Sequence, residues 1–199
     1  MATVILWPQS VVSNDWTIVG TGTADVVLLD NDYYNYLKTD TDDDFFELII
    51  DDLDSAVLNI DTITSIQVSM FSDMSQRSTS AVVTCDYRNA AGAVINSYTE
   101  DITINATGNL TNYTWTARTT YDGSHTWIDD GSGGDGQLDD LRLRVTMDTT
   151  DTSGAFTFIS QMYLTVTYTE LPTLTYPSDD NVILKNGLTE LKNGLTIIK

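Results

Sequence analysis

Apolar and polar residues alternate with a period of two along most of this chain, and this alternation constrains the fold more than any other feature. Residues 156–168 show it most clearly. The predicted inner face of this stretch carries the apolar side chains Phe156, Phe158, Met162, Leu164, Val166 and Tyr168. A period of two is typical of a β-strand with one buried face, whereas apolar residues at helical spacing are scarce. The chain is therefore predicted to consist mainly of β-strands.

The same alternation recurs along the chain and divides it into short strands. Further strands are predicted at Asp25–Leu29, Phe45–Ile50, Ile63–Phe71, Ser80–Tyr87, Val94–Ile104, Leu110–Ala117 and Leu141–Met147. The segments between them are rich in Asp, Asn, Gly and Ser, which favour turns. Many short strands joined by turns are typical of antiparallel sandwiches and jelly rolls. We expect residues 1–171 to form one antiparallel, jelly-roll-like β-sandwich domain, since 199 residues suit a single core of this kind.

The charge of the chain limits its partners. Acidic residues outnumber Lys and Arg by 29 to 9, which gives a net charge of −20. Most of the acids are aspartates, and these collect in turns. Such a field repels phosphate groups, so neither nucleic acid nor a membrane is expected as a partner. The N-terminus has no basic segment and its apolar run stops at Pro8, so no signal peptide or transmembrane helix is predicted, and synthesis is expected in a cytoplasm.

The balance of charge reverses at the C-terminus. Lysines outnumber acids after residue 181, and the motif LKNGLT occurs at residues 184–189 and again at 191–196. Each copy holds an Asn-Gly pair suited to a tight turn. Residues 172–199 are predicted to be a C-terminal arm that either docks on a neighbouring subunit or adds a hairpin to its own domain. Its predicted interaction residues are Leu184, Lys185, Leu188, Leu191, Lys192, Leu195, Ile197 and Ile198.

No constellation of residues predicts catalysis. His125 is the only histidine, which excludes zinc sites that need two, and Asp122 and Ser124 beside it do not form a nucleophile elbow. Cys85 lies in an apolar alternation and is predicted to be buried. The glycines of residues 131–136 satisfy a dinucleotide-binding pattern, but the aspartates around them would repel phosphate. We therefore predict no enzyme, no catalytic residue and no cofactor-binding residue.

Two acidic loops are candidates for calcium, the one cofactor that the sequence allows. The first loop offers the carboxylates of Asp129, Asp130, Asp135, Asp139 and Asp140. The second offers those of Asp40, Asp42, Asp43 and Asp44. Carboxylate oxygens suit calcium, but the spacing in the first loop departs from the EF-hand pattern. Solvated loops without metal are the simpler interpretation, and a calcium-stabilised surface domain remains a third hypothesis for the function.

An aromatic stretch suggests a second kind of site. Trp115 and Trp127, with Tyr113 and Tyr121, lie among Thr and Asn residues. Aromatic platforms beside amides hold sugars in β-sandwich modules, and packing in the core is the alternative for these side chains.

The order of short motifs along residues 7–169 resembles a family of jelly-roll-like structural proteins of tailed-phage virions. The motifs are Trp16, Asp32–Tyr34, Asp44–Ile50, Ile63–Val68, Asn89–Val94, Trp127 with Leu138 and Leu141, and Met162–Tyr168. The resemblance implies a virion structural protein, of the capsid decoration (cement) or tail appendage type. The LKNGLT arm has no counterpart in it.

Two functions follow as hypotheses. The leading one is a non-enzymatic capsid decoration protein on the outer virion surface of a tailed phage, which stabilises the particle through subunit contacts. Its expected partners are the major capsid protein or another virion protein, and it is expected to form a homo-oligomer, with a trimer favoured. The alternative is a carbohydrate-binding or receptor-binding β-sandwich module of the tail-fibre type.

Overall fold

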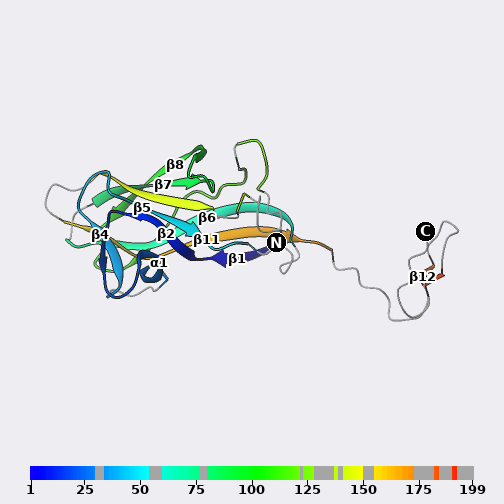
Figure 1. The fold of residues 1–199 in the computed structure, drawn as a ribbon, viewed down its shortest axis with the longest axis horizontal. Helices are drawn as coiled ribbons and strands as arrows, with labels where there is room; N and C mark the ends of the chain where they lie inside the picture. Colours follow the sequence, from blue (N-terminus) through cyan, green and yellow to red (C-terminus); the bar gives the residue numbers. More distant parts are fainter. Residues whose placement is uncertain are drawn as a thin grey trace.

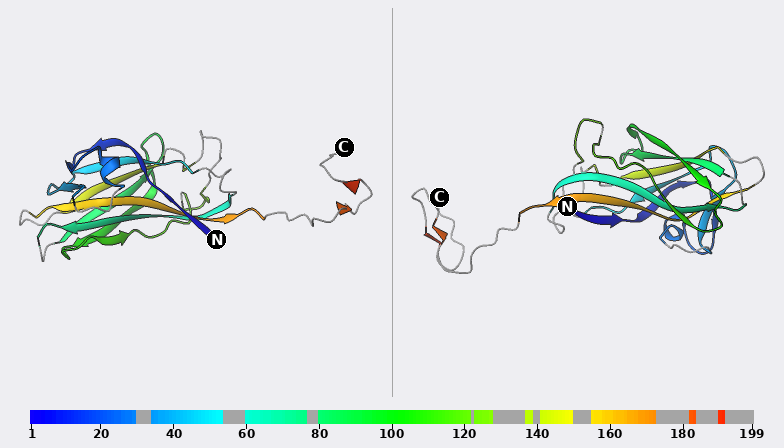
Figure 2. Two further views of the ribbon diagram at one scale, coloured as in Figure 1. Left: turned by 90° about the horizontal axis from the view of Figure 1, so that it is seen from below. Right: turned by 180° about the vertical axis from the view of Figure 1, so that it is seen from behind.

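The computed structural model describes the greater part of the chain. The described residues are 1–29, 34–53, 60–76, 80–121, 123–127, 137–138, 141–149, 155–172, 182–183 and 190–191. Two curved antiparallel sheets lie face to face in them, and the long strands β6 and β11 run the length of one sheet (Figure 1, Figure 2).

Sheet A is built around the two longest strands of the molecule. Its strands are β1 (Ala2–Leu6), β3 (Thr17–Val19), β4 (Tyr36–Thr39), β6 (Ile60–Met74), β9 (Thr111–Thr114) and β11 (Thr157–Glu170). Their order is β3-β4-β11-β6-β9, and β1 also pairs with β11. Strand β4 pairs with the beginning of β11 and β1 with its second half, so both lie along the same edge of that strand.

Sheet B packs against sheet A and completes the sandwich. Its strands are β2 (Pro8–Asn14), β5 (Phe45–Ile50), β7 (Ser80–Arg88), β8 (Val94–Asn105) and β10 (Arg142–Thr149). Their order is β2-β5-β10-β7-β8, and every neighbouring pair is antiparallel. The chain passes from sheet A to sheet B at Trp7, whose carbonyl accepts a hydrogen bond from Asp51 N at 2.8 Å.

One apolar core fills the space between the sheets. Alternate residues of each strand face it, as with Leu143, Val145 and Met147 on β10, which are all fully buried. Cys85 belongs to this core, as the sequence predicts. The predicted antiparallel, jelly-roll-like β-sandwich is confirmed.

The segment predicted as a strand at Asp25–Leu29 is a short helix, α1 (Ala24–Val27), and that prediction is wrong. Ala24, Val27 and Leu28 are buried while Val26 and Leu29 are exposed, so the apolar residues follow helical spacing over a stretch too short to reveal it. A Cβ on Gly22, whose φ is +117°, would lie 2.9 Å from Val26 Cγ1. No helix among the described residues has the length and apolar character required to cross a membrane.

A β-bulge at Ser160 changes which face of β11 is buried. Ile159 pairs with Ser72 but Gln161 pairs with Phe71, so Ser160 is an extra residue in β11. The face of the strand that points inward therefore changes at this residue. The prediction that Phe156 and Phe158 share the inner face with Met162 is consequently wrong, and Phe158 is absent from the central core cluster that holds Ile159 and Met162.

Two further strands lie in the predicted arm. Strand β12 (Val182–Ile183) pairs with β13 (Glu190–Leu191) as a separate two-stranded sheet. Of the predicted interaction residues, Leu191 lies in β13, and the other seven, Leu184, Lys185, Leu188, Lys192, Leu195, Ile197 and Ile198, lie outside the described residues. Docking of the arm on its own domain or on another subunit stays a prediction.

Candidate functional site

The two tryptophans proposed as a sugar platform from the sequence are core residues, and Tyr113 and Tyr121 are half-buried against that core. Trp115 and Trp127 are only 1% and 2% exposed. The indole N–H of Trp115 donates to Glu100 O at 2.8 Å, and that of Trp127 donates to Arg118 O at 3.0 Å. Tyr121 packs edge-on against Trp127, with ring centroids 5.4 Å apart. Because the two tryptophans are buried, they present no ring face to a ligand, and the prediction that they form the platform is wrong.

The predicted calcium loop, Asp129, Asp130, Asp135, Asp139 and Asp140, lies outside the described residues. In the second acidic loop, Asp40 to Asp44, the side chains spread apart. Within the described part of the chain, no three acidic, histidine or cysteine side chains gather closely enough to hold a metal ion. Calcium binding stays a prediction.

His125 and Cys85, the two residues with a potential for catalysis by a base or a thiol, differ in their exposure to solvent. His125 is exposed and its Nδ1 lies 3.2 Å from Ser124 Oγ, while Asp122 lies outside the described residues. Cys85 is buried, and burial, followed by the negative charge of Asp86, raises the pKa of its thiol far above the ordinary value. A thiol that stays protonated is a poor nucleophile, so Cys85 is a packing residue.

The outer face of sheet B carries a network of charges around Glu47 of β5. Glu47 is 2% exposed and three arginines surround it. Arg144 Nη2 lies 2.7 Å from Glu47 Oε2, Arg142 Nη1 lies 3.4 Å from Oε1, and Arg88 Nε lies 3.8 Å from Oε2. Two of these arginines also hold the turn between β7 and β8: Arg88 donates to Gly92 O at 2.9 Å, and Arg142 donates to Ala90 O. The charges on this face are thus engaged within the protein.

The outer face of sheet A is different, because the positions around the middle of β11 carry no carboxylate, ammonium or guanidinium group. The charged residues Asp73 and Lys38 lie toward the beginning of β11, where both pair with Phe158. Outward positions on β11 alternate with the buried Met162, Leu164 and Val166. Together with the paired positions of the neighbouring strands they form a surface that we call the outer strip. Its members are Ile5 and Trp7 near β1, Gln161, Tyr163 and Thr165 on β11, Gln67, Ser69 and Phe71 on β6, and Asn112 and Thr114 on β9.

Aromatic rings and amides lie side by side in the outer strip. Trp7 follows β1 directly, and its ring centroid lies 5.5 Å from that of Tyr163 at an interplanar angle of 54°. Both rings are half-buried, as is Phe71. The amide of Gln67 is held in place because its Nε2 donates to Trp115 O at 2.9 Å. The amide of Gln161 reaches Leu29 O, with an N–O distance of 3.5 Å.

Beyond the strip, toward the beginning of β11, the bulge places Phe158 on the outer side of sheet A, where it is still only 8% exposed, and Phe156 before it is half-buried. Phe158 lies 5.2 Å from Tyr36 and 6.3 Å from Phe156, measured between ring centroids. Lys38 of β4 pairs with Phe158 in register, and its Nζ lies 4.5 Å from the centre of the Phe156 ring. A second group of aromatic side chains therefore lies beyond Gln161 on the same side of sheet A.

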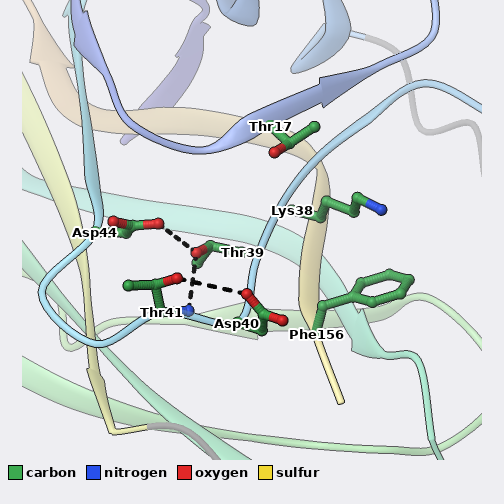
Figure 3. Close-up of a pocket in the computed structure, with 7 residues that line it drawn as sticks. All are labelled: Thr17, Lys38, Thr39, Asp40, Thr41, Asp44 and Phe156. Atoms are coloured by element: carbon green, nitrogen blue, oxygen red, sulfur yellow. Dashed lines mark hydrogen bonds between the residues drawn. The ribbon is translucent and has the colours of Figure 1, made fainter. Parts of the chain in front are cut away.

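A surface pocket of about 290 Å³ adjoins this second aromatic group. Its lining residues come from β3, β4, the β4–β5 turn and the segment before β11, and they are Thr17, Lys38, Thr39, Asp40, Thr41, Asp44 and Phe156 (Figure 3). Thr39 Oγ1 donates to Asp44 Oδ2 at 2.6 Å and accepts from Thr41 N at 3.1 Å. These bonds fix the turn that forms one wall of the pocket.

These surfaces differ in the ligands that they can accept. The Glu47 network uses its charges internally, whereas the outer strip combines ring faces with amides and hydroxyls on a surface without charge. Such groups suit an uncharged ligand with many hydroxyl groups. The sequence does hold a signal for two of the rings: Phe71 and Tyr163 are out of phase with the apolar alternation of their strands. No sequence signal marks Trp7 as their neighbour.

Comparisons with known proteins locate similar architectures only. No family model matches the chain, and no curated protein matches it. Among solved structures, the CBM36-1 domain of a multidomain xylanase from the hindgut metagenome of Trinervitermes trinervoides is 10% identical, with a TM-score of 0.44 over 85% of this chain and 100% of that one. A carbohydrate-binding module CBM36 in complex with calcium and xylotriose is 10% identical, with a TM-score of 0.39 over 84% of this chain and 100% of that one.

A phage protein also appears among the similar structures. The enzymatically active domain of bacteriophage CBA120 tailspike protein 4 is 9% identical, with a TM-score of 0.34 over 82% of this chain and 18% of that one. Identities at this level concern the fold alone. By its own strand order and core, the chain is an antiparallel, jelly-roll-like β-sandwich.

Proposed function

We propose that this protein is a non-enzymatic carbohydrate-binding β-sandwich, and that the outer strip of sheet A is its binding surface. The observation that carries the proposal is the composition of that surface. In a chain with a net charge of −20, the strip places Trp7, Tyr163 and Phe71 among amides and hydroxyls with no charged group between them.

The groups of the strip match the chemistry of a sugar chain. Sugar rings have apolar C–H faces that pack on aromatic rings, and their hydroxyls both donate and accept hydrogen bonds. Asn112, Gln161 and Gln67 offer amide groups, and Thr165 and Thr114 offer hydroxyls. Half-buried rings bind with little loss of side-chain entropy, because packing already holds them.

The net charge of the protein further limits the class of glycan that can bind. A surplus of 20 negative charges repels glycans that carry carboxylate or sulfate groups. A neutral glycan has no such cost. The strip holds no carboxylate that could act as a general acid or nucleophile, so the proposal includes no cleavage of the bound chain.

Binding to a panel of neutral oligosaccharides and polysaccharides, measured by calorimetry, tests the proposal. Trp7→Ala and Tyr163→Ala are each expected to weaken binding about tenfold or more, as for a central aromatic contact. Phe45→Ala is the matched control: Phe45 is a half-buried ring on the outer face of sheet B, 4.0 Å from the Arg144 guanidinium carbon.

Equal losses in all three variants would show that the strip is not the binding surface. Absence of binding to every neutral glycan in the panel would overturn the proposal itself. Capsid decoration, a virion location and trimer formation stay predictions, and no feature of the described residues favours them over this function.

A further inference from the structure

We infer that the pocket beside Phe156 receives the terminal unit of the bound glycan, so that the protein recognises a chain end and the outer strip holds the units that follow. This inference rests on the proposed function. It assigns a separate role to residues that lie outside the strip.

The position of the pocket supports a role at the end of a chain. The half-buried ring of Phe156 lines the pocket, and its centroid lies 6.3 Å from that of Phe158, which is only 8% exposed and supports it from below. There the β4–β5 turn contributes Asp40, Thr41 and Asp44 to the lining. A ligand that follows β11 toward its beginning therefore meets a wall at the turn, whereas a flat surface would let it continue.

The size of the pocket suits a single unit. Its volume of about 290 Å³ lies at the lower limit of small-molecule sites. It offers room for one sugar ring, and a second ring would have to lie outside the pocket, toward the half-buried ring of Tyr36.

The groups in the pocket suit a neutral unit with free hydroxyls. The Lys38 ammonium lies over the Phe156 ring and forms no ion pair with any described residue, so it can donate to a sugar oxygen. Figure 3 shows Lys38 and Phe156 extending toward the same side of the pocket, with the Asp40 carboxylate beside Phe156. The Asp40 carboxylate can accept from two adjacent hydroxyls.

The acids also exclude a class of ligand. Asp40 and Asp44 give the lining two negative charges against the one positive charge of Lys38. A terminal unit that carries a carboxylate would approach Asp40 at a cost, because like charges without a counterion repel each other. The pocket is thus expected to select a neutral chain end.

The test compares Asp40→Asn with Asp42→Asn in the full chain. Both variants remove one negative charge from the same exposed turn, but only Asp40 lines the pocket. The ligands are linear hexasaccharides of β-1,4-xylose, β-1,4-glucose and α-1,4-glucose. For the one that binds best, Asp40→Asn is expected to weaken binding about tenfold, and Asp42→Asn to change it less than about twofold.

A second measurement needs no variant. Blocking the hydroxyls of one terminal unit of that hexasaccharide with methyl groups is expected to weaken binding to the wild-type protein about tenfold at one end of the chain and not at the other. Equal affinity for both blocked forms and the free form would overturn the inference.

The two proposals fail in different ways. If Trp7→Ala weakens binding while Asp40→Asn and the blocked ends leave it unchanged, the strip binds internal segments and the pocket has no part. If the wild-type protein binds none of the three hexasaccharides and no other neutral glycan of the panel, both proposals fall together.

Discussion

The two outer faces of the sandwich differ in how they use their polar groups. On sheet B, Glu47 gathers Arg88, Arg142 and Arg144, and the first two of these arginines also hold the turn that follows β7. On sheet A, the strip around Tyr163 and Gln67 holds amides, hydroxyls and rings without any ion pair. Both faces come from the same alternation of inward and outward residues.

Under the proposed function, the outward positions of one fold serve stability on sheet B and binding on sheet A. Charged groups that already form ion pairs with one another have few hydrogen-bonding positions left for a ligand. Neutral polar groups gain less from their neighbours and remain available as partners. A change on sheet B should therefore alter the free energy of unfolding, and a change on sheet A should alter affinity.

Glu47→Gln should have the largest effect on stability. The change leaves three guanidinium groups close together without their shared buried carboxylate, which is expected to lower the free energy of unfolding by about 3 kcal/mol. Urea denaturation measures it. Glu170→Gln, at the exposed end of β11, is the control and should change stability by less than about 0.5 kcal/mol. Equal effects of the two variants would contradict a structural role for the Glu47 network.

Alkaline pH should lower the free energy of unfolding by a smaller amount, because two titratable side chains of β7 are buried in the core. Burial raises the pKa of the Cys85 thiol above its ordinary value of 9.0 and that of the Tyr87 phenol above 10.0. The unfolded chain loses these protons first, so the stability they contribute is complete below pH 9 and is lost as the pH rises. Ionisation of the Cys85 thiol in the unfolded chain should by itself make the free energy of unfolding about 2 kcal/mol lower at pH 10.5 than at pH 8.

Urea denaturation at several pH values between 8 and 10.5 measures this loss. Cys85→Ala should show a shallower dependence on pH, because the group that titrates is absent. If the dependence of that variant is as steep as in the wild-type protein, the burial of Cys85 is not its source.

Salt should have the smallest effect of the three, because the affinity for a neutral glycan depends on the uncharged outer strip of sheet A. Between about 0.05 and 0.5 M NaCl the affinity for a neutral glycan should change less than about twofold, because the strip holds no charge to screen. Calorimetry at the two salt concentrations measures it. A steep fall in affinity with salt would show that charged residues make the contact and would remove the distinction between the faces.

The sequence predicts the sandwich well because the alternation is local. The ranges expected for Phe45–Ile50 and Ser80–Tyr87 lie within one residue of β5 and β7. Short strands such as β3 and β4 escape notice, since three or four residues are too few to show a period.

The candidate site is predicted less well, because it depends on contacts between distant residues. Trp115 has the surroundings of an exposed residue in the sequence, but its N–H reaches the carbonyl of Glu100 and its ring lies in the core. The gathering of three arginines around Glu47 likewise depends on strand order. Phe71 and Tyr163 could be identified from their phase alone, whereas Trp7 joins them only through the pairing of β1 with β11.

Because Ser160 is an extra residue in β11, an insertion or deletion at this point would change this surface more than a substitution would. Substitutions can change one ring of the binding face at a time. Loss of one codon at this point would instead turn Thr157, Phe158 and Ile159 to the opposite side of sheet A, which would send the Phe158 ring toward the core and bring Ile159 to the outer face. The length of one strand, as much as its composition, thus decides what a ligand meets.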